Sequence, residues 1–103
     1  MAAFEWDPNK DRENFAKHHV SFAAAASIWD GAVLERTDNR RDYGETRLVA
    51  FGETSGVVLS VVYTWRAGAR RLISARKADR RERRAYEDEL RKRTQPPDRL
   101  GAP

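Results

Sequence analysis

The segment from Val57 to Trp65 constrains the fold more than any other part of the chain. Its odd-numbered residues are all apolar or aromatic, whereas its even-numbered residues are more mixed. A period of two places one row of side chains on one face of a β-strand. The segment therefore predicts a central strand, and the rest of the chain has to build a sheet around it.

Further strands and helices are predicted on both sides of this segment. Strands are predicted at Ala2 to Trp6, Val33 to Thr37, Glu45 to Gly52 and Arg71 to Lys77. Helices are predicted at Pro8 to His18 after an Asp7 cap, at Phe22 to Trp29 after a Ser21 cap, and at Asp79 to Arg93, where Asp79 and Glu82 form a capping box.

Consecutive strands joined by short turns favour an antiparallel meander. The order is strand, two helices, four strands and a helix, which predicts an α+β domain with an antiparallel sheet of four to five strands, two N-terminal helices and one C-terminal helix. One feature of the sheet stays open. The turn at Ala67-Gly68-Ala69 can have two or three residues, and a shift of one residue reverses which face Arg70 and Arg76 occupy.

The length of 103 residues fits one domain, which we place at residues 4–93, followed by a disordered tail at residues 94–103 that contains Pro96 and Pro97. The chain has no cysteine, which excludes disulfides, thiolate zinc sites and a cysteine nucleophile. No apolar run is long enough to span a bilayer, and the first residues carry acid where a signal peptide carries base. We therefore expect a soluble, cytoplasmic protein with no membrane contact.

Positive charge is concentrated in the last third of the chain. From Arg66 to Arg93 twelve basic residues face five acidic ones, so this part carries +7 while the whole chain carries +4. Such a field favours a polyanion, and an excess of Arg over Lys favours phosphate held through forked hydrogen bonds. The alternative is a solvated helix with internal ion pairs, such as Arg83 with Glu87.

Several motifs, in one order along the chain, resemble the BrnT family. The resemblance extends over about residues 4–88, and several motifs in the right order are more specific than any single one. The motifs are F-E-W-D-P-N-K at 4–10, Asn14, K-H-H-V-S-F at 17–22 with Ala25, I-W-D-G at 28–31, R-L-V-A-F-G at 47–52, V-V-Y-T-W-R at 61–66, R-L-I-S-A-R-K-A at 71–78 and R-R-E-R-R-A-Y-E at 80–87.

The resemblance implies a toxin of a type II toxin–antitoxin pair, a bacterial ribonuclease that arrests translation and growth. It also implies a RelE-like fold. The implied partner is a BrnA-like antitoxin with a ribbon-helix-helix domain, which neutralises the toxin and, in a higher-order complex, binds operator DNA. An acidic, disordered segment in that partner would fold onto a basic toxin.

Two positions depart from the family pattern. The usual K-H-G is here Lys17-His18-His19, so a helix stop that favours a left-handed residue is occupied by His. The usual T-E-R is here Thr64-Trp65-Arg66, which removes an acid beside the arginine.

Metal-free RNA cleavage uses the 2′-hydroxyl of the substrate as nucleophile, so the protein has to supply a base, an acid and cations around the phosphate. Lys17 and His18 are the candidates for proton transfer, with His18 as a simple helix-end residue being the alternative. Arg66 and Arg76 are the candidates for the phosphate clamp, although Arg76 could instead pair with an acid on the last helix. The catalytic candidates are thus Lys17, His18, Arg66 and Arg76.

Further basic and aromatic residues are candidates for binding the substrate. They are Lys10, Arg80, Arg83 and Tyr86, of which Tyr86 could equally be a packing residue. Adjacent histidines without a carboxylate at ligand spacing do not make a metal site, and no cofactor is expected. Two alternatives to the ribonuclease hypothesis remain: a non-catalytic RNA-binding module, and an interaction module that binds the antitoxin through the basic C-terminal face.

Overall fold

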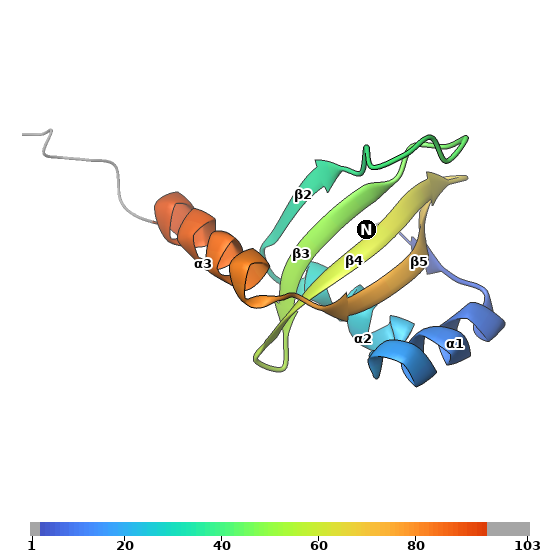
Figure 1. The fold of residues 1–103 in the computed structure, drawn as a ribbon, viewed down its shortest axis with the longest axis horizontal. Helices are drawn as coiled ribbons and strands as arrows, with labels where there is room; N and C mark the ends of the chain where they lie inside the picture. The colour runs from blue at the N-terminus through green and yellow to red at the C-terminus, as the bar shows by residue number, and fades with distance from the viewer. Residues whose placement is uncertain (1–2, 95–103) are drawn as a thin grey trace, which may run out of the picture.

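The computed structural model describes residues 3–94, which form one α+β domain (Figure 1). The predicted tail overlaps the last helix at Thr94, and from residue 95 onward it lies outside the described residues. The elements are β1 (Ala3–Glu5), α1 (Pro8–His18), α2 (Phe22–Ala26), the 3₁₀-helix η1 (Ser27–Asp30), β2 (Val33–Thr37), β3 (Leu48–Thr54), β4 (Val57–Arg66), β5 (Ala69–Lys77) and α3 (Arg80–Thr94).

The five strands form one sheet in the order β1-β5-β4-β3-β2. The four strands from β2 to β5 are the predicted antiparallel meander, with β4 between β3 and β5. The prediction of a fully antiparallel sheet is wrong at one edge, because β1 pairs parallel to β5. The two helices carry the chain from β1 to β2 at the other edge of the sheet, so β1 and β5 are not joined by a short turn that would force them to run antiparallel.

The odd-numbered residues of β4 face the core, as their pattern predicts. Leu59, Val61 and Tyr63 are at most 3% exposed, and Phe22 and Ile28 from the helical segment belong to the same buried cluster. The core therefore fills the space between one face of the sheet and the segment α2–η1. The opposite face of the sheet is left without a covering N-terminal helix.

The structure decides the open question of the register. The turn between β4 and β5 has two residues, Ala67 and Gly68, which both have positive φ, so Arg66 lies opposite Ala69. A bulge follows, because Tyr63 pairs with Leu72 and Val62 with Ser74, which leaves Ile73 unpaired. The bulge reverses the alternation of β5. Arg70 consequently faces the core side, and Arg76, opposite Ser60, faces the other side.

The predicted helix from Phe22 to Trp29 is shorter as an α-helix, since it changes to 3₁₀ geometry at Ser27. This tighter turn places Ile28, which is fully buried, against Gly52 of β3. A Cβ atom built on Gly52 would lie 2.8 Å from the Cβ of Ile28, so the two backbones approach as closely as they do only because residue 52 has no side chain.

Several strand boundaries also differ from their predictions, and among them β5 begins at Ala69 instead of Arg71. The first strand, Ala3–Glu5, ends before Trp6, because Asp7 already caps α1 by accepting a hydrogen bond from the Asn9 N–H; Ala2 lies outside the described residues. The third strand begins at Leu48 instead of Glu45, since residues 45–47 still belong to the preceding loop. It continues to Thr54, which pairs with Val57 across a two-residue turn.

Asn14 attaches α1 to the edge of the sheet. It is 7% exposed, and its amide nitrogen donates to the carbonyls of Val20 and Ala75, each at 2.8 Å. Its amide oxygen accepts from the N–H of Ala75 at 3.0 Å. The Asn14 side chain thereby provides hydrogen-bond partners for the backbone N–H and carbonyl of Ala75, as a neighbouring strand would. It fixes the C-terminal half of α1 beside Ala75 and Arg76.

The last helix begins at the predicted capping box. Glu82 N–H donates to the Asp79 carboxylate at 2.8 Å, and the Glu82 carboxylate accepts from Asp79 N–H at 2.9 Å. The helix then extends away from the sheet (Figure 1). Tyr86 anchors its first half, since it is 4% exposed and its hydroxyl donates to the Ala32 carbonyl. Between residues 3 and 94, no helix has the length and apolar character needed to cross a membrane.

Candidate functional site

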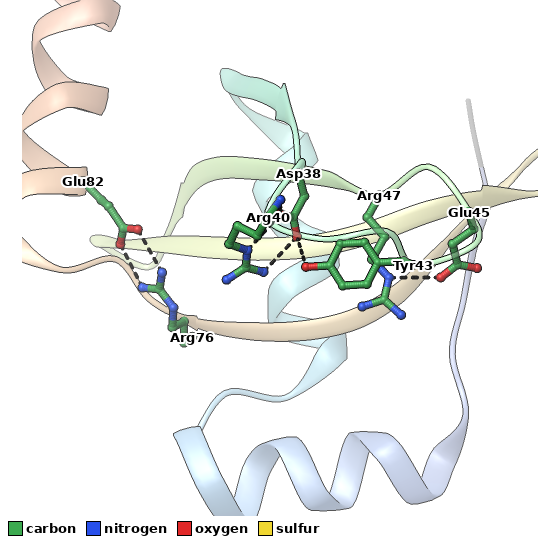
Figure 2. Close-up of polar contacts among 7 residues, drawn as sticks. All are labelled: Asp38, Arg40, Tyr43, Glu45, Arg47, Arg76 and Glu82. Carbon is green, nitrogen blue, oxygen red and sulfur yellow. Dashed lines mark hydrogen bonds and ion pairs between the residues drawn. The ribbon is translucent and has the colours of Figure 1, made fainter.

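A groove of about 650 Å³ lies on the face of the sheet that faces away from the core. Its floor comes from even-numbered residues of β4 and their neighbours in the sheet, and its walls come from the loop after β2 and the start of α3. Figure 2 shows two of its arginines, Arg40 and Arg76, with their carboxylate partners. The lining residues are His18, Arg36, Thr37, Asp38, Asn39, Arg40, Val49, Ser60, Val62, Ser74, Ala75, Arg76 and Glu82.

Arg76 and Glu82 form a two-point contact at one end of the groove. The two terminal nitrogens of Arg76 each donate to one carboxylate oxygen of Glu82, both at 2.8 Å. The Arg76 guanidinium lowers the pKa of the Glu82 carboxyl to about 2, from an ordinary value of 4.5, and hydrogen bonding to Glu82 raises the pKa of Arg76. The alternative raised for Arg76, a salt bridge to the last helix, is therefore present, and the arginine nevertheless lines the groove.

Asp38 organises the opposite wall. Its side chain is 1% exposed, and its two oxygens accept from Nε and Nη2 of Arg40, both at 2.8 Å. The hydroxyl of Tyr43 also donates to Asp38, and the Asp38 N–H donates to the Arg47 carbonyl (Figure 2). The hydrogen bonds that the Asp38 carboxylate accepts, led by the one from the Arg40 side chain, hold the pKa of the Asp38 carboxyl far below its usual range although burial opposes the shift.

The loop that follows β2 is held together by the same group of side chains. The guanidinium carbon of Arg47 lies 4.0 Å from the centre of the Tyr43 ring, and Nε of Arg47 donates to Glu45 at 3.0 Å. Cation–π contact and hydrogen bonding thus give a polar loop a defined shape. The loop places Arg40 beside the groove.

Two of the four predicted catalytic residues line the groove. His18 reaches it from the end of α1, and Arg76 reaches it from β5. Lys17 is exposed on α1 and does not line the groove, and the same holds for Lys10. Because Asn14 ties α1 to Ala75, the end of α1 that carries His18 is held at the same groove as Arg76.

Arg66 lies on the same face of the sheet as Arg76, but far from it along the strands. It ends β4 six residues beyond Ser60, the partner of Arg76, which corresponds to about 20 Å along a strand. Its Nε lies 3.9 Å from the Glu5 carboxylate, which also accepts from Arg71 at 3.1 Å. The structure therefore does not bring Arg66 and Arg76 together as a single clamp.

The predicted substrate-binding residues on α3 also lie outside the groove. Arg80 lines a separate shallow hollow on α3, together with Arg81 and Arg84. Arg83 is exposed and lies 3.9 Å from Glu87, as the ion-pair alternative proposed. Tyr86 is buried with its hydroxyl bonded to a backbone carbonyl, so its ring is not available to stack on a base, and the packing alternative describes it.

Trp65, where the family pattern has an acid, faces the core side of the sheet and not the groove. Its side chain is about half exposed, and the guanidinium carbon of Arg70 lies 4.6 Å from its ring centre. The adjacent Arg66 points to the other face, as alternation along a strand requires. The substitution at this position therefore alters the surface opposite the groove.

Sequence reasoning did not assign Arg36, Asp38 or Arg40 to the site, although all three line the groove. Asp38 and Arg40 lie between two predicted strands, in a polar stretch whose composition indicates only a loop. One signal was present, since an Asp directly after a strand and two residues before an Arg can accept local hydrogen bonds from the following backbone and side chain. That signal does not show that the loop folds over the same face as Arg76.

No group of three or more His, Cys, Asp or Glu side chains within residues 3–94 is arranged to hold a metal ion.

Comparison with known proteins gives one family. Residues 6–82 match the family model described as "Ribonuclease toxin, BrnT, of type II toxin-antitoxin system". A comparison with curated protein sequences finds no match. The matched residues begin directly after β1 and include the meander, His18, Arg76 and the loop that carries Arg40. The chain therefore belongs to the BrnT family of ribonuclease toxins of type II toxin–antitoxin systems.

Proposed function

We propose that this toxin is an endoribonuclease that binds an RNA strand in the groove and cleaves it without a metal ion. The observation that carries the proposal is the convergence of three arginines and one histidine on a single groove: Arg36, Arg40, Arg76 and His18. Cations around a phosphate and a proton carrier beside them are what cleavage by the 2′-hydroxyl of the substrate requires.

In this reaction the 2′-oxygen attacks the adjacent phosphorus, and the bond from phosphorus to the 5′-oxygen breaks. The products are a 2′,3′-cyclic phosphate and a 5′-hydroxyl. His18 is suited to take the proton from the 2′-hydroxyl, because it lines the groove and imidazole is the side chain that most often acts as a general base in enzymes. The arginines stabilise the charge that develops on the phosphoryl oxygens, and a proton is returned to the leaving oxygen.

The predicted basic residues outside the groove have a secondary part in this proposal. Arg66 lies on the same face of the sheet, and Lys10, Lys17, Arg80 and Arg83 are exposed. They add to the positive field that attracts RNA, which depends on charge more than on exact position. Tyr86 has no part in it, since it is buried.

Membership of a type II toxin–antitoxin system implies a cognate antitoxin. We propose that this partner is a BrnA-like ribbon-helix-helix protein that neutralises the toxin and binds operator DNA in complex with it, and that the toxin arrests translation in the cytoplasm. We also propose that the fold of this toxin is similar to that of RelE-like toxins. A basic toxin is a suitable partner for an acidic segment that folds on binding.

The test is to express the chain alone under tight induction in a bacterium and to map new RNA ends. Arg76→Ala and Arg40→Ala are expected to relieve growth arrest and to abolish the new ends. Arg93→Ala is the matched control, because it removes the same charge from an exposed site on α3, where the ion pair with Glu89 is as long as 3.9 Å. Purified toxin is expected to cleave RNA in the presence of a chelator.

Normal growth and intact RNA at confirmed soluble expression would contradict the ribonuclease proposal. Salt-dependent RNA binding without any product would then favour the non-catalytic RNA-binding module. Binding of the antitoxin alone, with no affinity for RNA, would favour the interaction module.

A further inference from the structure

Arg76 has two sets of paired donors, and Glu82 occupies only one of them. The terminal nitrogens Nη1 and Nη2 donate to Glu82, and Nη1 also donates to the Lys77 carbonyl at 3.1 Å. A guanidinium carries five N–H groups in a fixed plane. The Nε–H and the second N–H of Nη2 remain, and these two form a parallel fork of the kind that binds phosphate.

Arg40 is held in the complementary way. Its Nε and Nη2 donate to the two oxygens of Asp38, both at 2.8 Å, so the fork that is free in Arg76 is the one occupied here. The remaining donors, on Nη1 and the second N–H of Nη2, form the other fork. The Arg40 side chain is 72% exposed although its carboxylate partner is 1% exposed, so the free end extends away from the buried anchor.

The two arginines come from opposite walls of one groove. Arg76 belongs to β5 and Arg40 to the loop after β2, as Figure 2 shows. Both line the groove, together with Ser60 and Val62. Their charges act on each other, since Arg40 opposes the rise in the pKa of Arg76 that Glu82 causes. Two cations that face a common groove, each with one fork unused, favour a ligand with more than one anionic group.

From this geometry we propose that Asp38 and Glu82 are positioning residues, which hold Arg40 and Arg76 so that each presents its free fork to a phosphate of an RNA strand in the groove. The proposal rests on the proposed function and adds the substrate contacts and the residues that fix them. Each carboxylate takes up one fork and prevents rotation of the guanidinium, so less rotamer entropy is lost when the phosphate binds.

The proposal and simple electrostatics predict opposite changes in RNA affinity when one of these acids is removed. Removal of an acid next to the groove makes the protein more positive and, by charge alone, strengthens RNA binding. If the carboxylate positions the arginine, its removal weakens binding in spite of the added positive charge. Glu82→Gln distinguishes the positioning effect from the charge effect. A Gln side chain retains the capping box with Asp79 and so preserves the start of α3.

The experiment measures the Kd of a 5′-fluorescein-labelled eight-nucleotide 2′-O-methyl oligouridylate by anisotropy, since this probe cannot be cleaved. Glu82→Gln is expected to weaken binding by about 3- to 10-fold, and Arg76→Lys and Arg40→Lys by about 10-fold, because lysine keeps the charge but has no fork. Glu87→Gln, on an exposed part of α3, is the charge-matched control and is expected to bind as tightly as wild type or slightly tighter.

The outcomes distinguish this proposal from the proposed function. If Glu82→Gln binds as tightly as Glu87→Gln or tighter, or if both lysine variants bind like wild type, the positioning proposal is overturned while RNA binding stands. If the wild-type toxin does not bind the probe at all, both fail. Asp38→Asn is expected to follow Glu82→Gln, and thermal melting of every variant checks that lost affinity is not lost folding.

Discussion

Glu82 is bound to Arg76 through two hydrogen bonds of 2.8 Å, and the same carboxylate closes the capping box of α3 by accepting from the Asp79 N–H. One side chain therefore starts a helix and fixes an arginine of the groove. Any change that moves the first turn of α3 also moves the anchor of Arg76. The relationship couples the C-terminal helix to the candidate RNA-binding surface.

The stability of the protein is expected to fall in acid partly through this pair. The folded-state pKa of Glu82, about 2, lies below its ordinary value of 4.5, so the pair stabilises the fold fully above about pH 4.5 and loses its effect as the pH falls through 2. We expect Glu82→Gln to lower the free energy of unfolding by about 1 kcal/mol at pH 6, a modest figure because Arg76 is 43% exposed and water screens the pair. Denaturant unfolding at pH 6 and pH 2 measures it; a difference equal at both pH values would contradict the assignment.

Asn14→Leu is expected to destabilise the protein by about 2 to 4 kcal/mol. The leucine has a similar shape but leaves the N–H and carbonyl of Ala75 and the carbonyl of Val20 without the partner that they have now. Thermal or urea unfolding measures the loss. Glu13→Gln, on an exposed position of the same helix, should change stability by less than about 0.5 kcal/mol, and equal effects of the two changes would refute the role of Asn14.

Gly52→Ala is expected to cost about 1 to 3 kcal/mol, because the new Cβ would lie 2.8 Å from the Cβ of Ile28 and the 3₁₀ segment would have to shift. Gly31→Ala provides the control. Nothing lies within 4 Å of a Cβ at that position, and its φ of −127° suits any residue. Chemical denaturation of both variants tests the contact between Gly52 and Ile28. If the Gly52→Ala protein is as stable as the Gly31→Ala protein, β3 and η1 can move apart without a loss of stability and the expectation is wrong.

His19→Gly is expected to stabilise the protein by about 0.5 to 1 kcal/mol. His19 ends α1 with a φ of 60°, a left-handed conformation that glycine adopts with less strain than His. Ala16→Gly, inside the same helix, should have the opposite sign. The melting temperatures of both variants decide the matter, and a destabilised His19→Gly protein would mean that the edge-to-face contact between His19 and Phe15 outweighs the strain.

His18→Gln is expected to slow RNA cleavage by about 100-fold or more while RNA affinity changes by less than about two-fold, provided that His18 transfers a proton in the groove. Single-turnover cleavage of an end-labelled RNA gives the rate, and anisotropy with an uncleavable RNA gives the affinity. His19→Gln, which lies outside the groove, should leave both unchanged. An unaltered cleavage rate in His18→Gln would remove His18 from the mechanism.

Much of the fold could be predicted because its signals are local. The period of two in β4, the caps at Asp7 and Ser21 and the reciprocal spacing of Asp79 and Glu82 each act within a few residues. Those elements occur where the sequence places them. The boundaries that shifted depend on distant partners: the 3₁₀ turn at Ser27 on Gly52, and the start of β3 on the loop that Asp38 organises.

The candidate site could be predicted in its chemistry but only partly in its members. The excess of arginine and the BrnT motifs indicated phosphate and RNA, and they pointed to His18 and Arg76. They also suggested Arg66 and Tyr86, which the sheet register and the packing of α3 place elsewhere. Arg40 was missed because a loop residue reaches the groove only when the loop folds back over the sheet.

The sequence by itself determined which segments are strands and helices, where α1 and α3 begin, and to which family the toxin belongs, because these follow from periodicity, capping and motif order. The tertiary structure alone decided the faces of β5. A single unpaired residue, Ile73, reverses its alternation and separates Arg70 from Arg76. No local pattern encodes such a bulge, since it arises from the pairing of two strands, and it is this pairing that turns Arg76 toward the groove.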